Sequence, residues 1–192
     1  RRVGSGRSEW MSEANLDAKY IQMTQTPVES LICRLAVPTI ISNLITTFYN
    51  MADTFFIGKI STSASGAVGI AFAVMAAIQA VGFFFGQGSG NNISRLLGRQ
   101  ETDKAERLAA VGFYSALIGG ALIAATGLIF LKPLCILLGS TETILPYAMD
   151  YLKFILIGAP YMAASLVLNN QLRFEGSAFY GMIGLTTGAL IN

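Results

Sequence analysis

The chain has 192 residues, of which 53% are hydrophobic and only 12% are charged, and its formal net charge is +2. Because a soluble domain usually carries about 25% charged residues, this composition excludes an ordinary soluble protein and indicates a membrane protein. The sequence has no histidine and only two cysteines, which argues against zinc sites, haem sites and a Ser-His-Asp triad. We therefore expect a membrane protein that is not an enzyme and holds no cofactor.

Residues 1–30 are a polar segment that we expect to be a tail and not a folded domain. Met11 suits a translation start, because the polar residues after it lead directly into the first apolar segment. Residues 1–10 would then be upstream or non-native sequence. The remainder of the segment is expected to be a cytoplasmic tail or to lie on the membrane surface. The apolar segment that follows is too long and starts too late to be a cleavable signal peptide.

Long stretches without charged residues predict transmembrane helices, because a bilayer core requires roughly 20 apolar residues in helical form. We expect four complete spans, over residues 35–58, 64–89, 108–131 and 146–169. A fifth helix begins near Ala178 and stops at Asn192, too short to cross a core about 30 Å thick. The predicted fold class is an all-α membrane protein, a bundle of four complete transmembrane helices with the start of a fifth.

The distribution of basic residues predicts that the N-terminus is cytoplasmic. With this orientation, basic residues are more numerous on the inner side than on the outer side, as the positive-inside rule requires. The inner residues are Lys19, Arg34, Arg95, Arg99, Lys104, Arg107 and Arg173, and the outer residues are Lys59, Lys132 and Lys153. Acidic residues interrupt the basic connection between residues 95 and 107, so we expect no nucleic-acid-binding patch there. Cys33 and Cys135 fall near opposite membrane faces, too far apart for a disulfide.

The first predicted span carries one acid, Asp53, on a stripe of polar residues. At about 100° per residue, the polar side chains between Val37 and Phe56 fall within about 140° of arc. The stripe contains Thr39, Ser42, Asn43, Thr46, Thr47, Asn50, Asp53 and Thr54, with Tyr49 at its edge. A carboxylate on a polar stripe inside a membrane indicates a water-lined path, and so a transporter rather than a passive anchor. The alternative is an interfacial Asp53 whose carboxylate reaches the outer surface.

Prolines and a glutamine inside the spans each have two interpretations. Pro38 and Pro160 remove a backbone hydrogen bond and predict kinks, which are either static or change during transport. Pro38 is the better candidate for a changing bend, because it shares a helix with Asp53. Gln79, in the middle of the second span, either bonds to a neighbouring helix or faces the same cavity as Asp53.

Two further motifs indicate packing or solvent exposure and not a site. The sequence FGQGSG at residues 85–90 lacks the Lys-Ser/Thr of a P-loop, and we expect it to be a helix end with closely packed neighbours. The polar residues from Asn169 to Glu175 predict a solvated helix end on the inner side.

The segments LAVPTIISNLITTFYNMADTFFIGKI and AVGIAFAVMAAIQAVGFFFGQGSGNNISRLLGRQ closely resemble the opening of the multidrug and toxic compound extrusion (MATE) transporters. The later segment NNQLRFEG, which enters GMIGLTTGALIN, is similar to the passage between the fourth and fifth helices of that family. Order, spacing and loop lengths agree together from about Pro27 to Asn192. Within the family, the chain looks most like the bacterial branch related to the DNA-damage-inducible F proteins.

The resemblance implies twelve helices in two six-helix lobes, with Asp53 as the family's acid in the first helix. Tyr49 and Asn50 match its neighbours, and Pro38 matches the bending proline. Asn192 matches an asparagine of a cation site in the N-terminal lobe, which makes Asp53 and Asn192 possible sodium ligands. Ser42, Asn43, Thr46 and Gln79 are expected to line the same cavity. The family pattern places a second acid one turn past Asn192, so residues 31–192 are expected to be an incomplete N-terminal lobe.

The implied function is secondary active antiport, in which drugs or organic cations are exported in exchange for sodium ions or protons. The expected partners are a small cationic substrate, the lipid bilayer and the missing C-terminal lobe, and the expected location is the bacterial inner membrane. We do not expect this N-terminal fragment to transport alone. Two alternatives remain open, namely a lipid-precursor flippase of the same superfamily and a membrane scaffold without transport.

Overall fold

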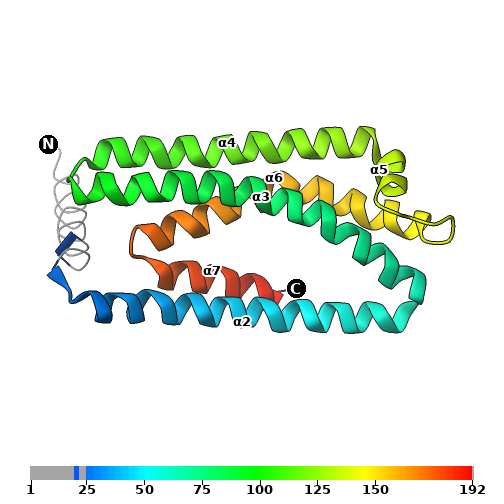
Figure 1. Ribbon diagram of the computed structural model, residues 1–192, viewed down its shortest axis with the longest axis horizontal. Coiled ribbons are helices and arrows are strands. Elements are labelled where there is room, and N and C mark those ends of the chain that lie inside the picture. Colours follow the sequence, from blue (N-terminus) through cyan, green and yellow to red (C-terminus); the bar gives the residue numbers. More distant parts are fainter. Residues whose placement is uncertain (1–19, 22–24, 192) are drawn as a thin grey trace, which may run out of the picture.

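The computed structural model describes residues 20–21 and 25–191, and all of the regular structure in these ranges is helical (Figure 1). The predicted all-α class is therefore confirmed. The helices are α2 (Val28–Ile60), α3 (Thr62–Gly98), α4 (Thr102–Ile129), α5 (Leu131–Leu137), α6 (Leu145–Phe174) and α7 (Ala178–Ile191). Most of residues 1–30 lies outside the described ranges, so the predicted tail stays a prediction.

Four of the helices are long and apolar enough to cross a membrane, with mean hydropathies of 1.6 for α2, 2.2 for α3, 1.9 for α4 and 1.6 for α6. The four predicted spans are thus confirmed. All four helices begin before their predicted starts, because helical hydrogen bonding continues through polar residues that lie outside the hydrocarbon core. The longest, α3, has 37 residues, which corresponds to about 55 Å and exceeds the ~30 Å core.

The short helix α5 was not predicted, because its sequence is as apolar as the end of the span before it. The third span was expected to continue to residue 131, but α4 ends at Ile129 and the chain turns at Phe130 (Figure 1). Pro133 lies in the first turn of α5, where a missing N–H breaks no helical hydrogen bond. Because the sequence stays apolar across the turn, hydropathy does not reveal the break.

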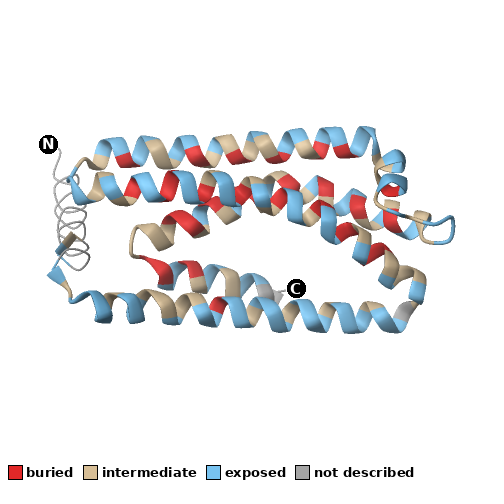
Figure 2. Ribbon diagram, viewed as in Figure 1, coloured by how far each residue is buried: buried red, intermediate tan, exposed pale blue. Residues whose placement is uncertain are grey.

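The core lies between α3, α4 and α6, and the buried residues in Figure 2 concentrate on these three helices. Small residues allow the helices to approach closely, as is usual in membrane bundles. Gly112, Ala116, Gly120 and Ala124 follow one another at four-residue intervals along the buried face of α4. A Cβ atom at Gly120 would lie only 2.7 Å from the Pro160 Cα on α6. The α4–α6 contact therefore brings the two backbones together.

The helices α2 and α7 form a second, looser layer beside this core (Figure 1). α2 packs mainly against α7 and only to a small extent against α3. Of the most apolar window of α2, only 6% is buried, against 33% for α6. α7, with 14 described residues, is not among the four helices that are long enough to cross a membrane. The helix that carries Asp53 is thus the least tightly held of the four spanning helices.

Candidate functional site

The polar stripe of α2 lies on one uninterrupted helix, so its residues share one face of the helix as predicted. Ser42 is the one stripe residue that is buried, with 1% of its surface exposed. Thr39, Tyr49 and Asp53 are half-buried, whereas Asn43, Thr46, Thr47, Asn50 and Thr54 are exposed. Pro38 is half-buried inside the same helix, as predicted.

The hydroxyl groups of the stripe are satisfied by their own helix. The hydroxyl of Ser42 donates to the Pro38 carbonyl oxygen at 2.8 Å, and that of Thr46 donates to the Ser42 carbonyl oxygen at 2.9 Å. Thr39, Thr47 and Thr54 donate in the same way to the carbonyl four residues earlier. Such groups need no water or neighbouring helix. Only Asn43, Asn50 and Asp53 of the stripe therefore call for a polar partner outside their own helix.

The acid is approached by tyrosines from two helices. Tyr49 lies one turn before Asp53 on α2, and Tyr151 of α6 is close enough to interact electrostatically with both. Tyr151 is half-buried and packs against the hydrophobic core. Asp53 forms no ion pair with any residue in the described part of the chain. The site thus combines a carboxylate that has no ion-pair partner in the described part of the chain with two phenol groups near it.

Sequence reasoning missed Tyr151, and no local signal identified it. One tyrosine in an apolar span is ordinary, and only the course of α6 through the bundle brings it near enough to Asp53 to interact electrostatically. Gln79 is half-buried on α3 and forms no hydrogen bond within residues 20–21 and 25–191, so the predicted interhelical bond is absent there. Its place in a cavity with Asp53 stays a prediction. Asn192 lies outside the described residues.

The structure contradicts the predicted solvated helix end after Asn169. Asn170 and Gln171 are buried, with 7% and 4% of their surfaces exposed. The Gln171 side-chain nitrogen donates to the Ser89 hydroxyl oxygen at 3.0 Å and to the Ala109 carbonyl oxygen at 3.1 Å. The prediction was wrong because α3 and α4 extend further than expected and cover this part of α6. Gln171 therefore links α3, α4 and α6.

The glycine-rich segment at residues 85–90 lies inside α3 and not at a helix end, because α3 continues to Gly98. Close packing, the other half of that prediction, is confirmed. A Cβ atom at Gly86 would lie 3.1 Å from the Asn170 side chain, and one at Gly90 would collide with the Phe174 ring. These glycines hold α3 against α6, and they bind no phosphate in our interpretation.

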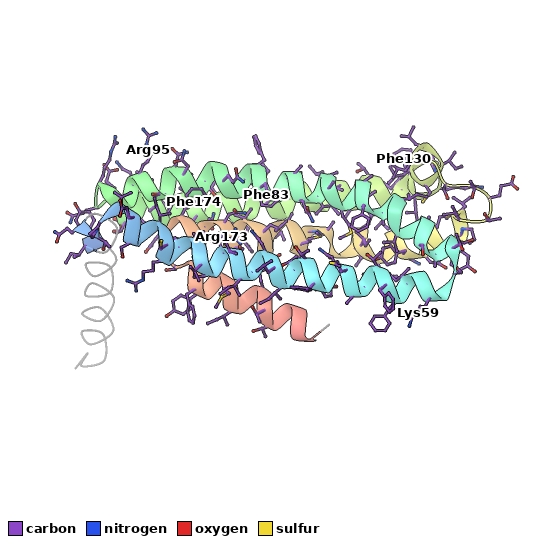
Figure 3. All side chains as sticks on the ribbon, turned by 60° about the horizontal axis from the view of Figure 1, so that its bottom comes forward. Lys59, Phe83, Arg95, Phe130, Arg173 and Phe174 are labelled. Carbon is purple, nitrogen blue, oxygen red and sulfur yellow. The ribbon has the colours of Figure 1, made fainter. Side chains whose placement is uncertain are left out.

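The charged residues mark the two ends of the bundle. Figure 3 shows Lys59 at one end and Arg95 at the opposite end. Among the described residues, no group of three or more His, Cys, Asp or Glu side chains is placed to hold a metal ion. A sodium site therefore stays a prediction.

Known proteins resemble this arrangement. A family model named MatE matches residues 38–192. The chain is 30% identical over 170 residues to a Shewanella oneidensis protein named FAD transporter, a match that covers 88% of this chain and 38% of that protein. It is 28% identical over 177 residues to the multidrug export protein MepA of Staphylococcus haemolyticus, over 92% of this chain and 39% of MepA.

A solved structure has the same fold. A multidrug resistance MATE family transporter of the MOP superfamily, in an outward-facing conformation, matches with a TM-score of 0.82 and 28% identity. The match covers 88% of this chain and 38% of that one. The chain thus spans about two fifths of the length of the proteins that it matches, at 38% to 39%.

Proposed function

The chain belongs to the MatE family, and on this premise we propose that it contributes to a secondary active antiporter. The antiporter exports drugs or other cationic small molecules across a bacterial inner membrane in exchange for sodium ions or protons. The names of two relatives refer to different cargoes, FAD and drugs. The cationic class is therefore inferred from the acid in α2 and not from the relatives.

The observation that carries the proposal is the half-buried Asp53 on a spanning helix, without an ion-pair partner among the described residues. A charged carboxylate in a medium of low dielectric constant is costly unless a cation neutralises it. A proton, a sodium ion and the cationic group of a substrate are the candidates. If only one of them occupies the carboxylate at a time, entry of the coupling ion releases the substrate.

The tyrosines and asparagines around the acid have supporting roles in this mechanism. Tyr49 and Tyr151 place phenol groups near the carboxylate that can act as hydrogen-bond donors in this mechanism, and Asn50 offers an amide within one turn of it. If sodium is the coupling ion, Asp53 and Asn192 supply oxygen ligands to it. A C-terminal lobe, which the family resemblance implies, supplies the opposite wall of the path.

The packing of α2 supports a moving role for this helix. Pro38 removes one backbone hydrogen bond within α2, so bending there is less costly than elsewhere in the helix. Because α2 buries little of its surface, a bend breaks few contacts with the core. We propose that occupancy of Asp53 changes this bend while α3, α4 and α6 move as a unit.

We also propose that the N-terminus is cytoplasmic. The basic connection between α3 and α4 would then lie on the inner side, at the end of the bundle where Figure 3 shows Arg95. Lys59 would lie at the outer end. Labelling of single cysteines at residues 59 and 95 with a membrane-impermeant reagent tests the orientation.

The test of transport is efflux of a cationic dye from vesicles that contain the full-length protein, driven by a sodium or proton gradient. Asp53→Asn should insert and fold but lose gradient-driven efflux, because an amide holds neither a proton nor a cation by charge. Asp150→Asn, at an exposed acid of α6, is the matched control and should keep it. If Asp53→Asn exports the dye as fast as the wild type, the proposal is wrong.

A scaffold without transport is the second candidate, and the self-satisfied hydroxyls of α2 favour it. Such a stripe can lie against lipid, so it is weaker support for a water-lined path than its composition suggests. Combined replacement of Ser42, Thr46 and Asn50 by alanine separates the two. Unchanged function after this replacement favours mere packing of the stripe, whereas loss of efflux favours a transporter. The lipid-precursor flippase is less favoured, because an acid in α2 does not suit an anionic headgroup.

A further inference from the structure

A groove of about 400 Å³ lies between α3, α4, α5 and α6, away from the site on α2. This volume is within the range of ~300–1,000 Å³ that is typical of ligand pockets. Ala73 and Ala77 of α3 and Gly127 of α4 form its sides, Leu134 of α5 closes one end, and Leu156 of α6 also lines it. The groove exists because α3 diverges from α4 toward the α5 end (Figure 1) and the facing side chains are small.

We propose that this groove binds one acyl chain of a membrane phospholipid in the outer half of the bilayer. Its lining is hydrocarbon apart from Thr126. The hydroxyl of Thr126 donates to the Leu122 carbonyl oxygen at 2.7 Å, so its proton is already used. No charged side chain lines the groove. A polar or cationic ligand would lose its hydration there and gain no partner in return.

The position of the groove favours a lipid over other apolar ligands. It lies between spanning helices, and its rim continues into the exposed apolar surface of α4. On that surface, Ile118, Leu122 and Ile129 are 60%, 62% and 73% exposed. No described residue covers these side chains, and an apolar face on a helix that spans the membrane suits acyl chains. The groove is therefore a recess in the lipid-facing surface, open to the hydrocarbon around it.

The end of the groove suits the headgroup region. α5 follows the last turn of α4, and it presents Ile136 and Leu137 with 54% and 82% of their surfaces exposed. A short helix with exposed apolar side chains lies at the membrane boundary, where it covers the upper part of a chain below it. Lys132 on the same helix is exposed and can pair with a lipid phosphate. This inference does not depend on the proposed transport activity, and only its placement in the outer half of the bilayer rests on the proposed cytoplasmic N-terminus.

Native mass spectrometry of the protein, purified in a mild detergent, measures whether phospholipid stays bound. Ala77→Phe places an aromatic ring in the groove, and Ala76→Phe, at an exposed neighbour outside the groove, is the matched control. We expect the wild type and Ala76→Phe to retain one phospholipid and Ala77→Phe to lose it. Retention by Ala77→Phe, absence of bound phospholipid in the wild type, or another bound molecule in its place overturns the proposal.

A second measurement leaves the groove unfilled and so does not depend on how Ala77→Phe folds. Phe130→Trp, at the groove, and Ile118→Trp, on the open surface of α4, are made separately in a Trp10→Phe background. Both proteins are equilibrated with phospholipid brominated on its acyl chains and then diluted into unbrominated lipid. Fluorescence should recover more slowly at residue 130 than at residue 118, because groove lipid exchanges slowly. Equal recovery rates contradict a held acyl chain.

Discussion

The contact between α4 and α6 gives the sharpest prediction about stability, because Gly120 of α4 lies directly against the backbone of α6. A Cβ atom at Gly120 would lie 2.7 Å from the Pro160 Cα and 2.9 Å from the Ala159 carbonyl oxygen. Carbon atoms normally pack at about 3.5–4.0 Å, so α4 must move about 1 Å away from α6. Both contacts are backbone atoms, so no rotamer change relieves them. Overpacking of this kind costs about 1–3 kcal/mol.

Gly158→Ala is the matched control for Gly120→Ala. A Cβ atom at Gly158, on α6, meets no heavy atom within 4 Å. Each substitution gains helix propensity of up to about 1 kcal/mol, and this gain cancels when the two variants are compared. Gly120→Ala should therefore be less stable than Gly158→Ala by about 1–3 kcal/mol. Unfolding by SDS in mixed micelles, followed by the loss of helical circular dichroism, measures the difference. Equal midpoints, or a more stable Gly120→Ala, refute the reasoning.

Two further predictions concern buried groups. Gln171→Leu removes two interhelical hydrogen bonds and should lower the free energy of unfolding by about 1 kcal/mol, at ~0.6 kcal/mol per bond. Gln87→Leu, at an exposed glutamine of α3, should change it little, and an equal loss in both variants contradicts the structural role of Gln171. Cys33 is exposed and Cys135 is buried, and burial raises the pKa of the Cys135 thiol. A maleimide at about neutral pH should therefore label Cys33 first, and faster labelling of Cys135 contradicts its burial.

The sequence was sufficient to predict the helices that cross the membrane, because each contains a long uncharged apolar stretch. It also gave the register of the stripe around Asp53, since helical periodicity alone decides which residues share a face of α2. Helix boundaries were less accurate. α3 continues through the polar residues up to Gly98, and α5 lies inside an apolar run in which composition does not change.

The parts that could not be predicted depend on which helices pack together. Tyr151 belongs to the site only because α6 passes near Asp53, and nothing in its own span indicates this. Gln171 looked solvated because it follows two asparagines, yet the extended α3 and α4 bury it. The hydroxyls of Ser42 and Thr46 looked like evidence for water, but they bond to their own helix. Polarity in a spanning helix is thus informative for Asp53 and less so for serine and threonine.

The role of Asp53 as the shared site for substrate and coupling ion is tested most directly by competitive binding. Binding of a fluorescent cationic dye to the purified protein is measured at increasing sodium concentration and, separately, at decreasing pH. The account predicts that the affinity of the wild type falls as one of these ions increases, and that Asp53→Asn loses this dependence. Dye binding to Asp53→Asn that still weakens with the same ion, as in the wild type, would contradict it.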